Sequence, residues 1–239
     1  MRPLSAAELL TVWESNVQRL PLTQALAMLA AASPDETADE LARLPIGSRN
    51  ERLLTLRGWQ FGPEMTALAG CPACGEQVEL TCWVEDLQTQ PEHGLHGPLP
   101  TLETQGGPVS FRLPNTYDLL AAGQAPDVDA ARLIVARRCL QATEAISPDS
   151  LEPALLDRLA AAMETADPLA LIELAAHCPH CDHDWSALLD VATFFWQEVQ
   201  TWAQRTLRDV HLLARAYGWS EDEILKMSPV RRQASLQLA

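Results

Sequence analysis

The sequence predicts a mainly α-helical protein with a small β element, an α+β fold, and three observations lead to this prediction. Apolar residues recur at helical spacing behind helix-start signals along most of the 239 residues. Two Cys-Pro-x-Cys motifs, at Cys71–Cys74 and Cys178–Cys181, interrupt that pattern. After the first motif, apolar and polar residues alternate with a period of two, which is typical of a strand.

The N-terminal region, residues 1–58, is expected to form several short helices. Three Ser-x-x-Glu patterns and one proline predict where these helices begin: Ser5–Glu8, Pro21, Ser33–Glu36 and Ser48–Glu51. Each is followed by apolar residues at mostly helical spacing. Starts this close together predict a compact helical region rather than one long rod.

The middle of the chain, residues 59–113, changes character. It contains Cys71-Pro-Ala-Cys74-Gly75, and the alternation over 78–82 then predicts a strand. Residues 88–108 are rich in proline, glycine and histidine and are expected to form a long mobile loop. Residues 109–113 are expected to form a short strand that ends at a proline.

A helical insertion, residues 114–168, separates the first cysteine motif from the second, which lies in residues 169–187. Asn115 is expected to cap the first helix of the insertion. Longer helices are expected over about 127–142 and 148–165, the latter opened by Ser147 and Pro148.

The C-terminal region, residues 188–239, predicts one long amphipathic helix over about 188–217. Gly218 stands where the C-cap of this helix belongs. A capping box at Ser220–Glu223 and the pair Ser228-Pro229 predict two short helices after it.

Four cysteines give the strongest chemical signal: Cys71, Cys74, Cys178 and Cys181. Zinc prefers four tetrahedral ligands and binds thiolates well, and two Cys-Pro-x-Cys turns supply a complete set. A closed site of four thiolates leaves no position for water or substrate, so the predicted zinc ion is structural. The fold class is therefore mainly α with a small β zinc ribbon, in which two knuckles about 100 residues apart are joined across a long helical insertion.

Other chemistries for these cysteines stay open at this point. Iron in a rubredoxin-like site uses the same ligands. A redox-active Cys-x-x-Cys normally lies at a strand–helix junction, which the sequence does not predict, and disulfides are rare in the cytosol. The histidines around the second motif are either exposed turn residues or additional ligands: His177, His180 and His183. Cys82 and Cys139 are expected to act as buried small apolar residues.

Composition excludes several functional classes. The formal net charge of −15 repels phosphate backbones and anionic membranes, so neither nucleic-acid nor membrane binding is expected. No apolar run approaches the roughly 20 residues of a membrane span, and no N-terminal leader pattern is present, which predicts a cytoplasmic protein. The sequence contains no recognisable catalytic or phosphate-binding motif, so we expect no enzymatic activity and no small-molecule substrate.

Several segments, taken in order, resemble one family. They are Trp13-Glu14, Leu44–Leu54, Phe61-Gly62-Pro63, the two cysteine motifs, Phe111–Leu120 and the C-terminal Val210–Gln233. Together they resemble tailed-phage baseplate proteins that also occur in phage-tail-like contractile injection particles. The ending Tyr-Gly-Trp-Ser-Glu-Asp-Glu-Ile-Leu, followed by Arg231 and Arg232, is the most characteristic part. The likeness covers nearly the whole chain.

The resemblance implies a non-enzymatic role, either as a baseplate component or as a chaperone-like factor that helps the baseplate hub to assemble on the spike. The implied partners are hub, spike or wedge proteins, and the protein would be cytoplasmic or part of a tail-like particle. The metal ligands fall on the four cysteines named above. Asp182 departs from the pattern, because glycine often follows the second cysteine of a knuckle, and the second turn is therefore expected to be looser.

Two alternatives remain at this point. One is a zinc-ribbon or rubredoxin-like module that serves nucleic acid or electron transfer, although the acidic charge weakens the first of these. The other is a prophage product with no retained role. Tryptophans near the C-terminus either anchor an interface or fill the core: Trp185, Trp196, Trp202 and Trp219.

Overall fold

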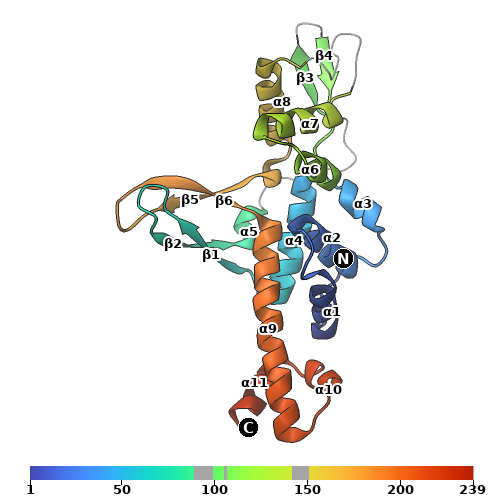
Figure 1. Ribbon diagram of the computed structural model, residues 1–239, viewed down its shortest axis with the longest axis vertical. Coiled ribbons are helices and arrows are strands. Elements are labelled where there is room, and N and C mark those ends of the chain that lie inside the picture. The colour runs from blue at the N-terminus through green and yellow to red at the C-terminus, as the bar shows by residue number, and fades with distance from the viewer. Residues whose placement is uncertain (89–98, 105–106, 142–150, 239) are drawn as a thin grey trace.

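The computed structural model describes residues 1–88, 99–104, 107–141 and 151–238. Within these residues the chain is mainly helical, and its strands form three separate two-stranded antiparallel sheets (Figure 1). The predicted combination of a mainly helical chain with small β elements is thus confirmed. Three parts extend from a central helical body: two β-hairpins on one side, an insertion at one end and the C-terminal helices at the other (Figure 1).

The central body consists of four N-terminal helices and the long helix near the C-terminus. Their bounds are α1 (Ala6–Asn16), α2 (Pro21–Ala32), α3 (Ala38–Arg43), α4 (Ile46–Phe61) and α9 (Val191–Tyr217). Leu29, Leu53, Phe195 and Val199 are fully buried at the centre of its core. Helix α9 has 27 residues, about 40 Å of helix, and its second half projects beyond the body (Figure 1).

Some helix starts follow the sequence prediction. Ser5 caps α1 through the expected reciprocal bonds with Glu8, and α2 begins at Pro21. The start predicted at Ser33–Glu36 was wrong, because Ser33 instead ends α2 and its N–H bonds to the carbonyl of Ala30. The capping box of α3 is Thr37–Glu40, which repeats the same sequence pattern four residues later. The two patterns are adjacent in the sequence, and the helix begins at the second one.

Helix α4 begins at Ile46 rather than at the predicted Ser48, because a distant residue caps it. Its own N-cap is a proline without a side-chain acceptor. Asp167 Oδ2 instead accepts a 2.9 Å hydrogen bond from the Gly47 N–H, across 120 residues of chain. A β-carbon at position 47 would lie 1.7 Å from Asp167 Oδ1, so only glycine permits this approach. The carboxylate also stands at the positive end of the helix dipole.

Two hairpins of similar construction flank the insertion in sequence. The first is β1 (Glu64–Gly70) with β2 (Gln77–Trp83), followed by the short helix α5 (Val84–Leu87). The second is β5 (Ile172–His177) with β6 (Asp184–Leu189), preceded by the 3-10 turn η1 (Pro168–Ala170) and followed by α9. The strand predicted over 78–82 lies within β2. Residues at the bases of both hairpins join the main core: Met65, Val84, Ile172 and Leu189.

The predicted insertion, 114–168, packs with a third hairpin that precedes it in sequence, and the term insertion includes this hairpin from here on. Its elements are β3 (Thr101–Thr104), β4 (Gly107–Ser110), α6 (Thr116–Ala122), α7 (Val128–Cys139) and α8 (Pro153–Ala166). A second apolar cluster, including Leu102, Val109 and Phe111, packs β3 and β4 against α7 and α8. The predicted cap at Asn115 is confirmed, as is the helix from Asp127.

Two predictions for residues 88–113 were wrong. Thr101–Thr104 and Gly107–Ser110 form strands, although the loop was expected to continue to 108, because Leu102 and Val109 pair directly and are buried together. The strand expected over 109–113 ends at Ser110, where the chain turns to pair Phe111 with Leu140. Residues 89–98 and 105–106 of the predicted loop, and the predicted helix start at Ser147-Pro148, lie outside the described residues.

The chain ends in a small helical cluster around the projecting half of α9. Gly218 ends α9 in the left-handed conformation, with φ of 70°, as predicted. Ser220 caps α10 (Glu221–Leu225) and Ser228 caps α11 (Pro229–Gln237). Helix α10 packs back on Val210 and Leu213 of α9 through Ile224, and α11 packs against the same cluster through Leu236.

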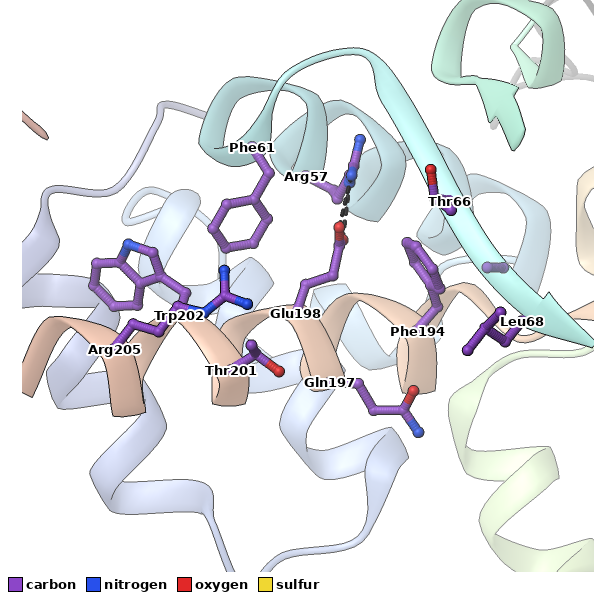
Figure 2. Close-up of a pocket in the computed structure, with 11 residues that line it drawn as sticks. Arg57, Phe61, Thr66, Leu68, Phe194, Gln197, Glu198, Thr201, Trp202 and Arg205 are labelled. Carbon is purple, nitrogen blue, oxygen red and sulfur yellow. Dashed lines mark hydrogen bonds and ion pairs between the residues drawn. The ribbon is translucent and has the colours of Figure 1, made fainter. Parts of the chain in front are cut away.

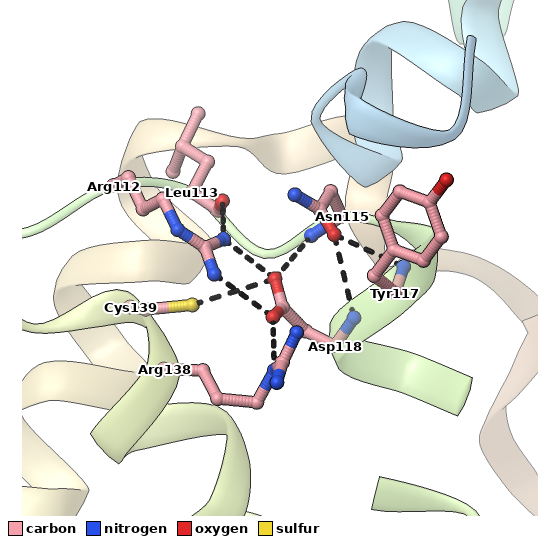
Figure 3. Close-up of polar contacts among 7 residues, drawn as sticks. All are labelled: Arg112, Leu113, Asn115, Tyr117, Asp118, Arg138 and Cys139. Atoms are coloured by element: carbon pink, nitrogen blue, oxygen red, sulfur yellow. Dashed lines mark hydrogen bonds and ion pairs between the residues drawn. The ribbon is translucent and has the colours of Figure 1, made fainter. Parts of the chain in front are cut away.

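Asp118 is the polar centre of the insertion (Figure 3). Its fully buried carboxylate accepts hydrogen bonds from Arg112 at 2.5 and 2.9 Å and from Arg138 at 2.7 Å. It also accepts one from the N–H of Asn115, and so completes the capping box of α6. Burial opposes ionisation, but the bonds from Arg112, Asn115 and Arg138 outweigh it and lower the pKa of Asp118 to about 2.

We predict that Asp118→Asn removes a pH-dependent part of the stability. A carboxyl group whose pKa falls from 3.8 to about 2 on folding stabilises the native state fully above pH 3.8 and loses this effect as the pH drops through 2. At neutral pH the variant should be less stable by about 3 kcal/mol, because the buried pairs are broken. Urea unfolding at several acidic pH values should show the gap to wild type narrowing. Asp157→Asn, which breaks the exposed pair with Arg132, should change stability by less than about 1 kcal/mol. A gap that is constant with pH would contradict the assignment.

Candidate metal centre

The two Cys-Pro-x-Cys motifs form the turns of the two similar hairpins. In both turns the N–H of the first cysteine donates to the carbonyl group five residues later. The carbonyl group of the same cysteine accepts a hydrogen bond from the N–H four residues later. The pairs are Cys71 to Glu76 at 2.8 Å, Gly75 to Cys71 at 2.9 Å, Cys178 to His183 at 2.9 Å and Asp182 to Cys178 at 2.9 Å. The two turns are therefore equivalent in backbone structure, although about 100 residues separate them.

The hairpin tips meet, and all four predicted cysteines come together. The Sγ atoms of Cys71 and Cys181 are 3.7 Å apart, and those of Cys74 and Cys178 are 3.6 Å apart. All four sulfur atoms lie within 4.8 Å of one another. A tetrahedral ion with metal–sulfur bonds of about 2.3 Å requires sulfur–sulfur distances of about 3.8 Å. The two closest pairs thus match the spacing that a tetrahedral ion needs, and all four sulfur atoms are near enough to share one ion.

This geometry weighs against two of the other chemistries. A disulfide has a sulfur–sulfur distance of about 2.05 Å, much shorter than the separations here, and all four cysteines are free thiols. Both motifs connect antiparallel strands rather than a strand and a helix, so neither has the position of a redox-active Cys-x-x-Cys. A possible metal site remains.

The site has a buried side and an exposed side. Cys71 and Cys178 are buried beside Val78, with Leu80 and Trp185 packed against them. Cys74 and Cys181 are exposed at the hairpin tips. This small apolar cluster is separate from the main core, so the tips have little other than the sulfur atoms to hold them together.

The thiols affect one another's ionisation. Burial disfavours the Cys71 thiolate, but the N–H groups of Cys74 and Ala73 outweigh this effect and lower the pKa of Cys71 to about 7. The His183 N–H favours the Cys181 thiolate, yet the neighbouring thiols, with burial, raise the pKa of Cys181 to about 12. Four thiolates this close repel one another, and a cation between them removes that repulsion.

The expectation of a looser second turn was wrong. Asp182, at the position equivalent to Gly75, has φ of 55°, and Gly75 has φ of 79°. Both turns keep the same hydrogen bonds at nearly the same lengths. Aspartate is among the few residues with a side chain that tolerate this left-handed conformation, which explains why the turn is preserved. Asp182 is the only residue other than glycine with positive φ in the described parts of the chain.

The histidines of the second motif do not join the four thiols. His177, His180 and His183 are all exposed. His177 Nδ1 lies 2.8 Å from Asp184 Oδ1, and the ring of His183 stacks on Trp185 at a centroid distance of 6.3 Å. Among the described residues, the group of metal-ligating side chains that can share one ion consists of the four cysteines.

The remaining cysteines lie elsewhere. Cys139 is buried as predicted, and burial raises the pKa of its thiol to about 12. Its Sγ atom is 3.8 Å from Asp118 Oδ2, so it belongs to the polar centre of the insertion rather than to an apolar core, which the sequence did not indicate. Cys82 is half-buried against the main core.

The four C-terminal tryptophans do not form one surface. Trp196 is buried in the main core, Trp185 packs on the cysteines, and Trp219 stacks on Tyr217 at 4.4 Å. Trp202 is half-buried near the hairpin β1–β2, where it lines a groove.

The fold and the site define a mainly helical protein in which two antiparallel hairpins bring four thiols together in a possible metal site. Comparison of the chain with protein-family models, with curated proteins and with solved structures finds no match. In the described parts of the chain, no helix combines the length and the apolar character needed to cross a bilayer.

We predict that Asp182→Gly stabilises the protein by about 0.5–1 kcal/mol, because glycine removes the cost of the left-handed conformation. Gly75→Ala places a side chain in the equivalent conformation and should destabilise by about 1 kcal/mol. Thermal unfolding of both variants, measured with the metal content held equal, checks the pair. Asp182→Asn should match wild type, since asparagine tolerates the same conformation. Equal stability of Asp182→Ala and Asp182→Gly would contradict the conformational explanation.

Proposed function

We propose that Cys71, Cys74, Cys178 and Cys181 bind one structural Zn²⁺ ion and that the two hairpins together form a zinc ribbon. The observation that carries this proposal is the spacing of the four Sγ atoms, at 3.6 and 3.7 Å in the two closest pairs. Four protein ligands fill a tetrahedral shell, so the ion has no open position for water or substrate. Its role is to hold the hairpin tips together.

The energetics of loop closure favour such a role. Joining residues 104 positions apart costs chain entropy, but this cost grows only as the logarithm of the loop length. Zinc binding to four ligands in small peptides is worth roughly 10–16 kcal/mol at neutral pH, which is ample to offset it. Zinc also neutralises the repulsion between the thiolates. An iron ion in a rubredoxin-like site would satisfy the same geometry.

We predict that the purified protein contains one zinc ion per chain and that Cys178→Ser loses it. Loss of a buried ligand should lower the melting temperature strongly, because the tips of both hairpins separate. Cys82→Ser, which changes a half-buried cysteine outside the site, should keep the zinc. Elemental analysis and thermal unfolding measure both effects.

Metal exchange keeps this test decisive even if Cys178→Ser fails to fold. Replacing zinc with Co²⁺ in the wild-type chain should give the intense visible bands of a tetrahedral cobalt–thiolate site. A red purified protein that contains iron would instead indicate a rubredoxin-like centre and contradict the zinc assignment. Full zinc content and wild-type melting in Cys178→Ser would overturn the four-cysteine site.

We further propose that the protein is a non-enzymatic assembly protein of a contractile phage tail or tail-like injection particle, either a baseplate component or a factor for hub assembly. Its partners are hub, spike or wedge proteins, and it acts in the cytoplasm or within the particle. The resemblance that ends in Tyr217–Leu225 and Arg231-Arg232 supports this proposal. Large apolar side chains on the exposed strands, Leu68 at 70% and Leu188 at 67% exposure, suit a protein that binds other proteins.

The assembly role predicts what a tagged copy recovers from its native host. Mass spectrometry should identify tail-tube, spike or baseplate proteins, and near-stoichiometric amounts in finished particles would indicate a component rather than a transient factor. The Asp182→Asn variant, which keeps the fold, should recover the same proteins. Recovery of RNA polymerase, ribosomal or redox proteins in their place would contradict the assembly role, while leaving the metal site unaffected.

A further inference from the structure

Strand β1 pairs with β2 along one edge, and no other strand in the described part of the chain covers its second edge. In its pairing with β2, the N–H of Cys71 donates to Glu76, and the N–H of Val84 donates to Pro63 at the other end of the hairpin. Hydrogen-bonded pairs alternate along an antiparallel ladder, so the odd-numbered residues of β1 bond to β2. The N–H and C=O groups of Thr66 and Leu68 therefore point away from β2. Within the described residues neither has a hydrogen-bond partner on that side.

This free edge borders a groove of about 530 Å³ between β1 and α9 (Figure 2). Three consecutive residues of β1 line it: Thr66, Ala67 and Leu68. Successive side chains of a strand point to opposite faces, so a wall made of consecutive residues is the edge of the strand and not one face. The opposite wall is α9, which contributes Phe194, Gln197, Thr201, Trp202 and Arg205.

An ion pair fixes the floor of the groove. Arg57, only 4% exposed, donates to both carboxylate oxygens of Glu198 at 2.6 and 2.9 Å. Its other terminal nitrogen donates to the carbonyl groups of Gly62 and Glu64, at the start of β1. One guanidinium thus joins α4, α9 and β1, and it holds the free edge at a set distance from α9 (Figure 2).

Among the described residues that line the groove, Arg205 is the exposed cation. Arg205 is exposed at its end and has no ion-pair partner among the described residues, in contrast to Arg57. Two half-buried aromatic rings of α9 line the same groove: Phe194 lies near β1, and Trp202 lies beside Arg205 (Figure 2). The walls therefore offer main-chain hydrogen bonds on one side, aromatic surface on the other and a positive charge at one end.

We propose that this groove binds an extended segment of a partner protein, which adds a strand to β1 through Thr66 and Leu68 and places an acidic side chain against Arg205. Strand addition takes its affinity from main-chain bonds and its specificity from alternate side chains, and both elements are present here. A second copy of the chain is disfavoured as the occupant because each copy carries a net charge of −15. The inference stands apart from the identity of the metal and of the particle.

The first measurement tests the edge itself. Amide hydrogen exchange followed by NMR in the full-length zinc-loaded protein should show fast exchange at Thr66 and Leu68. Met65, Ala67 and Ala69, which bond to β2, should exchange much more slowly. Slow exchange at Thr66 and Leu68 in the free protein would show that the edge is already paired and would overturn the proposal.

The second measurement identifies the occupant. Selection from a display library of random ten-residue peptides on the same protein should enrich β-branched segments with an Asp or Glu at a fixed position. Binding of a selected synthetic peptide, followed by fluorescence anisotropy, should weaken by about tenfold or more in Thr66→Pro, which removes an outward N–H from β1. Thr81→Pro is the matched control. Thr81 pairs directly with Thr66, so this substitution removes an outward N–H from the opposite edge of the hairpin.

Charge reversal tests the position of the acidic side chain. Arg205→Glu should weaken the acidic peptide by about tenfold and favour a variant with Lys at that position. Arg208→Glu, also exposed on α9 but outside the groove, should leave both affinities unchanged. The proposal would be overturned if no peptide is enriched, or if both proline variants lose peptide affinity equally. It would also be overturned, in favour of pairing between two copies of the chain, if the protein forms a dimer that Thr66→Pro dissociates.

Discussion

The arrangement of this protein depends on the approach of four cysteine side chains from two hairpins far apart in sequence. Their sulfur atoms lie within 4.8 Å of one another, where four thiolates repel strongly unless a cation lies between them. The apolar cluster at the hairpin tips buries only Cys71, Val78 and Cys178, far fewer residues than the main core. A cluster of this size stabilises little by itself. The contact between the tips therefore depends on the sulfur atoms and on the ion that we propose they hold.

The bases of the same hairpins are held differently. Met65 and Ile172, near the start of each hairpin, are buried in the main core, so each hairpin is anchored at its base by apolar packing and at its tip by cysteine. The insertion between them is closed a second time where Asp167 caps α4 at Gly47. The chain leaves and re-enters the body at fixed points, so the insertion can build its own core around Phe111 without affecting the metal centre.

The structural features that the sequence predicted best are those that depend on neighbouring residues. The caps at Ser5, Asn115 and Ser220 and the C-cap at Gly218 were all correct, because each depends on bonds within a few residues. The start of α4 was missed because its cap comes from 120 residues away, and no local pattern encodes that. The cysteine motifs predicted the long-range contact only because their chemistry requires four ligands around one ion. The free edge of β1 was not foreseen, since it depends on pairing register and on the distant Arg57–Glu198 ion pair.

The metal centre and the groove act on opposite ends of the same strand. The Arg57 guanidinium fixes the start of β1 through the carbonyl groups of Gly62 and Glu64, and Cys71 follows directly after its last residue. A strand held at both ends has little conformational entropy left to lose when another strand pairs with it. Without a link at the tip, the β1–β2 hairpin would be anchored at its base alone, where Met65 and Val84 lie in the main core. If the proposed ion holds the tip, it would support the proposed strand addition without contacting the partner, because it would limit movement of the free edge.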